Sequence, residues 1–317
     1  ITASDPAIER YKHLLPDLFA QAAILAMNDR QSASMYTGSF DVGGNNGYGL
    51  NFTRHYQFLR DGVLEYSCDN FGERTLNNNS AIQNVQHVIQ ADPTMHLVKF
   101  DREGQDILMV NWRAHPTMTG GTGKTVMSSD YVGALREAIE ADTGMAAIFF
   151  QGAAGNINAV SKLNAEQHGL DHWKYGKALS NQILAAMDGG CLTQQQTGLW
   201  QVDTYDYTAT VDHSDDDRYG EASAFAAEYY DKFPGNNAPQ AERLAWCAER
   251  GWTCVFEASS IVRRYGKGKT EQMSLSTMAL GDGLAFFTAP GELWDRVSME
   301  IEEASPFATT FCLGYCG

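Results

Sequence analysis

Apolar residues recur along the chain with two periods, one typical of helices and one typical of strands. The helical period predicts helices at about residues 5–27, 131–140, 165–188, 218–232, 239–250 and 292–303. Short apolar runs predict strands at 96–100, 107–112, 145–151, 199–211, 272–280, 284–288 and 309–313, with further short strands between residues 32 and 65. Because strands alternate with helices and some neighbouring strands can form hairpins, the pattern predicts an α/β fold with a mixed β-sheet core covered by helices.

The chain is long enough to form one large hydrophobic core. It has 317 residues, of which 44% are hydrophobic, and it shows no internal repeat and no linker. We therefore expect a single large domain over residues 1–317. The start, Ile1-Thr-Ala-Ser-Asp, is neither a signal peptide nor an initiator methionine context, and no closing helix follows the last apolar run. These features predict a partial domain that is cut at both ends.

Charge and hydropathy exclude two classes of partner. The formal net charge is −16, which argues against nucleic acid, because phosphates call for a basic protein surface. No stretch approaches the roughly 18–20 uninterrupted apolar residues that a transmembrane helix needs. We therefore expect no nucleic-acid partner and no transmembrane segment. The compartment and the oligomeric state do not follow from the sequence.

The six cysteines leave two interpretations open. They are Cys68, Cys191, Cys247, Cys254, Cys312 and Cys316, and none forms a CxxC motif. Cys312 and Cys316 could bracket a turn, and Cys247 and Cys254 could pair. The simpler interpretation is a set of free, mostly buried thiols.

Three buried strands are each followed by a sharp turn that carries polar groups. The first runs into His115-Pro-Thr, the second into a glycine turn that contains Asn156 and Asn158, and the third into Pro290-Gly-Glu292. In open α/β sheets, ligand sites gather where the loops beyond strand ends converge. Histidine nitrogen and carboxylate oxygen are zinc ligands, so the pattern predicts a metal site that contains His115 and Glu292.

Each of these residues also has a structural interpretation. His115 could cap or pack against the strand end, and Glu292 could complement the dipole of a helix that begins there. The turn at 152–155 could serve close packing alone. The residue types by themselves do not decide between these roles and a metal site.

The segment Gly120-Gly-Thr-Gly-Lys-Thr125 resembles a phosphate-binding loop without matching one. The pattern GxxxxGK[ST] requires glycine at position 118, where this chain has Met118. The segment also follows His115-Pro116 rather than leading directly from a strand into a helix. We therefore interpret it, together with Gly43–Gly47, as a glycine-rich rim of the active-site pocket.

Taken in order, the polar segments resemble the neutral/alkaline ceramidase family, as a divergent bacterial-type member would. The segments are His96-Leu-Val-Lys-Phe-Asp-Arg-Glu-Gly-Gln, Asn111-Trp-Arg-Ala-His115-Pro-Thr, Ser129-Asp130-Tyr-Val-Gly133, Phe150-Gln-Gly-Ala-Ala-Gly155-Asn and Pro290-Gly-Glu292. The resemblance spans most of the chain, but residues 190–270 carry no motif of the family.

The resemblance implies a zinc site and the hydrolysis of an amide bond by zinc-bound water. In that family two histidines, a glutamate and a tyrosine hold the zinc, and His115 and Glu292 match the second histidine and the glutamate. The first histidine belongs to a segment that would lie just before Ile1. The tyrosine would lie just after Gly317, with Tyr315 as a remote candidate.

This chain departs from the family at the glycine turn. The ceramidases carry a serine that is needed for catalysis, where this chain has Asn158 in Gly155-Asn-Ile-Asn-Ala. Asparagine can only donate and accept hydrogen bonds. The departure favours another amide or an ester as substrate, with Asn156 or Asn158 stabilising the oxyanion. Arg54 resembles an Asn-Arg segment of the family and would face the site; the alternative is a surface salt bridge.

The first hypothesis is therefore a zinc-dependent hydrolase of amide or ester bonds that acts on a small-molecule or lipid-like substrate. The second is a binding module for a carbohydrate or lipid headgroup that has the same fold but no catalytic activity. The third, a nucleotide-dependent enzyme that uses Gly123-Lys-Thr125, would require stabilisation by nucleotide, which we do not expect.

Overall fold

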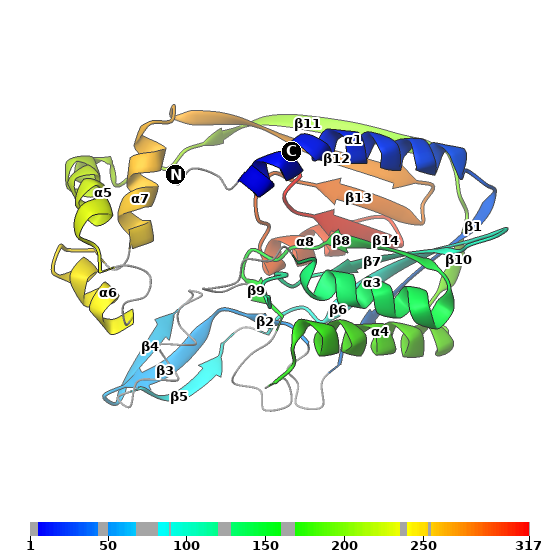
Figure 1. Cartoon of the computed structure of the whole chain (residues 1–317), viewed down its shortest axis with the longest axis horizontal. Helices are drawn as coiled ribbons and strands as arrows, with labels where there is room; N and C mark the ends of the chain where they lie inside the picture. The colour runs from blue at the N-terminus through cyan, green and yellow to red at the C-terminus, as the bar shows by residue number, and fades with distance from the viewer. Residues whose placement is uncertain are drawn as a thin grey trace.

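The computed structural model describes residues 6–43, 50–67, 82–88, 90–119, 128–159, 169–234, 240–252 and 255–316. Figure 1 shows the whole chain. Gly120–Thr125 and nearly all of Gly43–Gly47 lie outside the described residues, so their predicted position at the rim of a pocket stays a prediction.

A mixed sheet lies at the centre of the described part of the chain (Figure 1). Its strands, in order, are β10 (Thr193–Gln195), β1 (Ala33–Asp41), β6 (Thr94–Arg102), β7 (Ile107–Trp112) and β8 (Ala146–Gln151). The predicted hairpin is confirmed, because β6 and β7 are antiparallel with His96 opposite Asn111. β8 lies parallel to β7, so the loops after both strands begin at the same edge of the sheet.

Two helices, α3 (Asp130–Thr143) and α4 (His172–Asp188), pack together over one face of this sheet (Figure 1). Gly176 of α4 permits the close packing, because a Cβ there would stand 2.6 Å from the backbone nitrogen of Leu135. Within this core the indole of Trp112 donates a hydrogen bond to the hydroxyl of Tyr175 (3.1 Å).

Helix α4 begins later than predicted. We expected a helix from residue 165, whereas residues 169–171 are not helical. The Asp171 side chain accepts a hydrogen bond from the backbone N–H of Lys174 (2.8 Å) and so caps the helix at this point.

A second sheet packs against the other face of the first. Its strands, in order, are β11 (Trp200–Thr210), β12 (Thr270–Leu280), β13 (Leu284–Thr288) and β14 (Thr309–Leu313). Both sheets contribute to a shared core of Met35, Val98, Leu284, Phe286 and Phe311. Helix α8 (Asp295–Ala304) connects the parallel strands β13 and β14 and packs against β14. Mixed sheets covered by helices confirm the predicted α/β class.

Short strands complete the part of the molecule near the strand ends. β2 (Phe52–Thr53) pairs with β9 (Ile157–Asn158). β3 (Tyr56–Arg60) pairs with both β4 (Val63–Ser67) and β5 (Ile82–His87). The β2–β9 pair places residue 54 beside the glycine turn that follows β8.

Three helices form a separate hydrophobic cluster beyond one end of the β11–β12 pair (Figure 1). They are α5 (Tyr219–Lys232), α6 (Gln240–Ala248) and α7 (Val255–Tyr265), and a short 3₁₀ helix, η1 (Asp216–Arg218), precedes them. α5 and α6 are close to the predicted helices, whereas α7 was not predicted. Its apolar residues Val255, Ala258, Ile261 and Val262 recur at helical spacing and were the signal that could have found it.

The first predicted helix is confirmed as α1 (Pro6–Asn28). Its apolar side chains are nevertheless exposed, among them Leu14, Leu18, Phe19 and Leu25. Helical spacing of apolar residues therefore predicted the helix but not where its apolar face lies. None of the helices in the described ranges is both long and apolar enough to cross a membrane.

Four cysteines lie in the described ranges, and three of them, Cys191, Cys312 and Cys316, are free thiols. A pair between Cys312 and Cys316 is therefore not formed. Cys254 lies outside the described residues, so a pair with Cys247 stays untested. Burial raises the pKa of the Cys312 thiol to about 12, which keeps it protonated and unreactive at neutral pH.

Candidate functional site

The three polar segments predicted from the sequence meet at the ends of β7, β8 and β13. The backbone N–H of Gly152 donates to Trp112 O (2.9 Å), and that of His115 donates to Ile157 O (3.2 Å). The N–H of Gly155 donates to Leu293 O (2.7 Å). These backbone hydrogen bonds hold the glycine turn between the strand end with His115 and the loop with Glu292.

Gly155 is the residue that lets the turn approach the Glu292 loop so closely. A Cβ at this position would stand 2.6 Å from Glu292 O and 2.7 Å from Trp294 Cδ1, closer than real contacts allow. Any other residue would push the loop away. The close approach of this turn therefore requires glycine.

His115 lies three residues beyond the end of β7, and both of its ring nitrogens have partners. Nδ1 donates to the carbonyl oxygen of Ile157 (3.0 Å), which leaves Nε2 with its lone pair. Nε2 accepts from the hydroxyl of Tyr315 (3.1 Å) and lies 3.6 Å from Glu292 Oε2. The predicted ligands His115 and Glu292 are therefore neighbours, and Tyr315 joins them.

Tyr315 was only a remote candidate for the expected tyrosine, and the structure places it beside both residues. The N–H of Tyr315 donates to Gly291 O (2.7 Å), and the N–H of Cys316 donates to Ala289 O (3.1 Å). Tyr315 has a φ of +63°, which is rare and strained for a bulky residue and often marks functional sites.

Glu292 does not begin a helix, contrary to the predicted helix 292–303. It lies in the loop before α8, which starts at Asp295. A role in complementing the dipole of that helix is therefore wrong for Glu292, and the acidic residue in the first turn is Asp295. The Glu292 side chain is 53% exposed and the His115 side chain 16%.

The phenol of Tyr315 is held in its neutral form. Burial raises its pKa, the Glu292 carboxylate raises it further, and the nearby Arg54 guanidinium lowers it in part. The net pKa is above the usual value for tyrosine.

The donor atoms of these three residues fit a zinc ion. With Zn–N and Zn–O bonds of about 2.0–2.1 Å, two ligand atoms in a tetrahedral site stand about 3.3 Å apart. The distances from His115 Nε2 to the Tyr315 hydroxyl and to Glu292 Oε2, 3.1 and 3.6 Å, lie on either side of that value. Among the described residues, no cluster of three or more histidines, cysteines, aspartates and glutamates could hold a metal.

Arg54 and Asn156, two predicted catalytic residues, line the same region. The N–H of Arg54 donates to Asn156 O (2.9 Å), and its guanidinium donates to Gly155 O. The Asn156 amide donates to His55 Nε2 (3.3 Å). Burial and the charge of Arg54 lower the pKa of His55, which keeps this acceptor neutral.

Asn158, the third predicted catalytic residue, lies in β9. It pairs with Phe52 and forms a β-bridge with His115, so its backbone lies next to the predicted ligand. Its side chain is half-buried.

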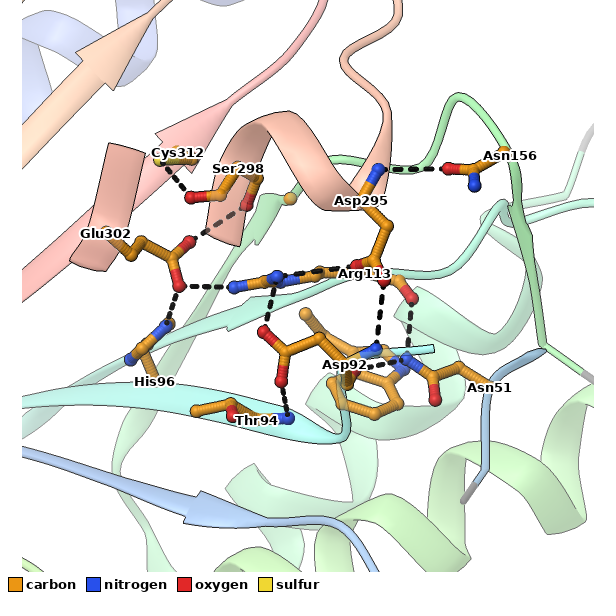
Figure 2. Close-up of polar contacts among 12 residues, drawn as sticks. Asn51, Asp92, Thr94, His96, Arg113, Asn156, Asp295, Ser298, Glu302 and Cys312 are labelled. Atoms are coloured by element: carbon orange, nitrogen blue, oxygen red, sulfur yellow. Dashed lines mark hydrogen bonds and ion pairs between the residues drawn. The ribbon is translucent and has the colours of Figure 1, made fainter. Parts of the chain in front are cut away.

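A buried ionic cluster that was not predicted lies around Arg113, two residues before His115 in the chain (Figure 2). Arg113 is 1% exposed, and its guanidinium faces three carboxylates: Asp92 at 2.5 Å, Asp295 at 3.4 Å, and Glu302 in a short contact. Glu302 also interacts with His96 Nε2 (3.1 Å) and accepts from Ser298 Oγ (2.9 Å). The sequence could have indicated this cluster, because Arg113 directly follows an apolar strand and a buried arginine needs a negatively charged partner. The sequence does not identify which carboxylates those partners are.

The carboxylates of this cluster differ in their pKa values. Burial raises the pKa of Glu302, but the hydrogen bond from His96 and the charge of Arg113 outweigh it and lower the net pKa. For Asp295, burial is the larger effect and the net pKa is raised, although a hydrogen bond from Asp92 N and the Arg113 charge lower it in part.

Two solved ceramidase structures are similar to this chain. A neutral ceramidase from Pseudomonas aeruginosa matches with a TM-score of 0.49 and 15% identity, over 90% of this chain and 45% of that one. A ceramidase complexed with C2 matches with a TM-score of 0.48 and 13% identity, over 90% of this chain and 47% of that one. The chain thus spans about half the length of these proteins. No protein-family model and no curated protein matches the sequence.

Proposed function

We propose that this chain is the metal-binding part of a zinc-dependent hydrolase that cleaves an amide or ester bond. The proposal rests on two distances from His115 Nε2. The Tyr315 hydroxyl lies 3.1 Å from this nitrogen, and Glu292 Oε2 lies 3.6 Å from it. Histidine nitrogen and carboxylate oxygen are common zinc ligands, and the phenol oxygen adds a third donor on the same side of the histidine ring.

The second hydrogen bond of His115 supports a ligand role. Histidines that bind metals donate their other ring N–H to a carbonyl or carboxylate, which sets the tautomer and orients the ring. His115 Nδ1 makes this contact with Ile157 O at 3.0 Å. The ring therefore presents Nε2 to Glu292 and Tyr315 in the form that can bind zinc.

Zinc bound by these residues would supply a Lewis acid and lower the pKa of a water molecule. Arg54 provides a positive charge near the Tyr315 phenol, where it can bind an oxygen that becomes negative in the transition state. Asn156 is buried and bonded to other protein groups through both ends of its amide, so we assign it the task of holding the glycine turn in place.

We propose a lipid-like or other small-molecule substrate with an apolar group. Trp294 is half-exposed beside the glycine turn, and its ring contacts His55 edge to face at 5.5 Å between centroids. An exposed aromatic ring next to the candidate ligands offers a surface for an apolar group. Because Asn158 replaces the serine of the ceramidases, we do not propose ceramide itself as the substrate.

A second function remains a candidate because of that same replacement. A binding module with this fold could hold a carbohydrate or lipid headgroup at the same strand ends without cleaving it. The hydrolase would turn over its substrate when zinc is bound, whereas the binding module would not.

Zinc content of the purified chain tests the proposal. We expect one zinc per chain at micromolar supply, and His115→Ala and Glu292→Gln should each weaken zinc binding about 100-fold or more, as loss of a ligand does. His213→Ala is the matched control, because His213 pairs with Asp216 far along the chain at 3.0 Å. A chain without stoichiometric zinc would refute the metal site. Zinc binding without turnover of acyl amides and esters would favour the binding module.

A further inference from the structure

We propose that Arg113 is a positioning residue of this site. Through Asp295, it holds the loop that carries Glu292 in place relative to the strand end that carries His115. This inference rests on the proposed function, because it concerns the same site. It adds a residue that neither the sequence resemblance nor the candidate ligand set contains.

The burial of Arg113 shows that its charge depends on protein partners. Its side chain is 1% exposed, and an unpaired charge at such depth would cost several kcal/mol. Its partners come from separate parts of the chain: Asp92 precedes β6, whereas Asp295 and Glu302 lie in α8. One guanidinium thus joins the first sheet to the helix that follows the Glu292 loop (Figure 2).

Asp295 transmits this contact to the loop. It is the first residue of α8 and lies three residues after Glu292. Its carboxylate accepts from the N–H of Asp92 (3.0 Å) and contacts Arg113, while its own N–H donates to Asn156 Oδ1 (2.9 Å). Asp295 therefore links the strand end, the segment before β6 and the glycine turn at one point (Figure 2).

Each candidate ligand lies within three residues, along the sequence, of one partner of the Arg113–Asp295 contact. Arg113 precedes His115 by two residues, and Asp295 follows Glu292 by three. A shift of Asp295 relative to Arg113 would thus be passed to the distance between His115 and Glu292.

Lysine could not replace arginine in this role. Arginine presents its donors in a rigid planar fork, and here Nη1 faces Asp92 and Asp295 while Nη2 faces Glu302. Lysine has one ammonium group on a flexible chain, so it keeps the charge but cannot hold three carboxylates in one arrangement. Arg113→Lys therefore separates geometry from charge.

The test compares Arg113→Lys with Arg102→Lys. Arg102 is also a buried arginine of the same sheet, with a side chain 8% exposed and an ion pair to Asp29 at 2.7 Å, but it lies at the opposite end of β6. Zinc affinity would be measured by competition with a chromophoric chelator, and coordination by the visible spectrum of the Co²⁺ form. We expect Arg113→Lys to weaken zinc binding about ten- to 100-fold and to alter the cobalt spectrum, and Arg102→Lys to do neither.

A second variant covers the case in which Arg113→Lys does not fold. Asp295→Asn keeps the backbone N–H that binds Asn156 and an oxygen that can accept from Asp92, but it loses the charge that faces Arg113. Burial raises the pKa of Asp295, so neutralising it costs the fold little. A purely structural cluster would leave zinc affinity unchanged in this variant, whereas a positioning role predicts weaker zinc binding at an unchanged melting temperature.

The outcomes separate this inference from the proposed function. If the unmodified chain binds zinc and both variants bind it equally well, the inference is wrong and the proposed function stands. If the unmodified chain binds no zinc, both are wrong. If the variants lose zinc affinity while Arg102→Lys does not, Arg113 positions the ligands.

Discussion

Two groups of polar residues lie near the end of β7, and they differ in burial and in how their charges are paired. In the outer group, the side chains of Glu292 and Tyr315 are about half exposed, at 53% and 50%. In the inner group, Arg113 is 1% exposed and faces three carboxylates. The outer group leaves donor atoms available to a ligand, whereas the inner group uses its charges on one another. The proposed metal ligands and the buried ionic cluster are thus different residues near one strand end.

The largest loss of stability is expected from removing the positive charge of Arg113 in the inner group. Arg113→Met should destabilise the protein by about 3–5 kcal/mol, because it leaves buried carboxylates without a counter-charge. Urea unfolding followed by circular dichroism measures the change. Arg296→Met is the control on α8, since Arg296 pairs with Glu300 at 2.9 Å in an exposed position, and it should hardly shift the midpoint. Equal midpoints for the two variants would contradict the difference between buried and exposed pairs.

A smaller loss of stability, which depends on pH, is expected from substitution of Glu302. Its pKa is lowered in the folded state, so the ionised form stabilises the protein above the unfolded pKa of 4.5, and this stabilisation is lost as the pH falls through the lowered folded pKa. Glu302→Gln should cost about 2 kcal/mol at pH 7 and progressively less below pH 4.5. Unfolding at a series of pH values measures this difference, and a cost that does not vary with pH would refute the ionic role.

Gly155 connects the two groups, and its substitution should affect both stability and zinc binding. Gly155→Ala places a Cβ 2.6 Å from Glu292 O, so the loop must move, at a cost of about 1–2 kcal/mol. Zinc affinity should fall as well, because the loop carries Glu292, one of the proposed ligands. Gly266→Ala is a control, because no atom of the described residues lies within 4 Å of the new Cβ. Normal zinc binding by Gly155→Ala would show that the loop position does not matter.

The smallest effect on the stability of the protein is expected from Tyr315→Phe. The phenol is one of three proposed ligands, and its hydroxyl donates to His115 Nε2 at 3.1 Å. Its removal should weaken zinc binding about 100-fold, as loss of a ligand does, and leave the urea midpoint within experimental error, because the ring is half-exposed. Chelator competition and unfolding are measured on the same preparation. A large loss of stability would instead assign Tyr315 to the supporting group.

Most elements of the fold could be predicted because their signals are local. The β6–β7 hairpin and strand β14 follow from apolar runs bounded by turns, and the structure confirms them. α7 was missed although its spacing is helical, and α4 starts at His172 because Asp171 caps it. The exposed apolar face of α1 shows that periodicity predicts a helix without predicting its partner.

The sequence by itself predicted that His115 and Glu292 would lie close together, because each follows a buried strand, and the loops after such strands tend to meet. Only the tertiary structure decided that Tyr315 lies 3.1 Å from His115 Nε2. Only the tertiary structure paired Arg113 with Glu302, which lies 189 residues away. Local sequence patterns predict the secondary structure of each segment. A buried charge needs oppositely charged partners, and only the packing of distant segments brings these partners to it.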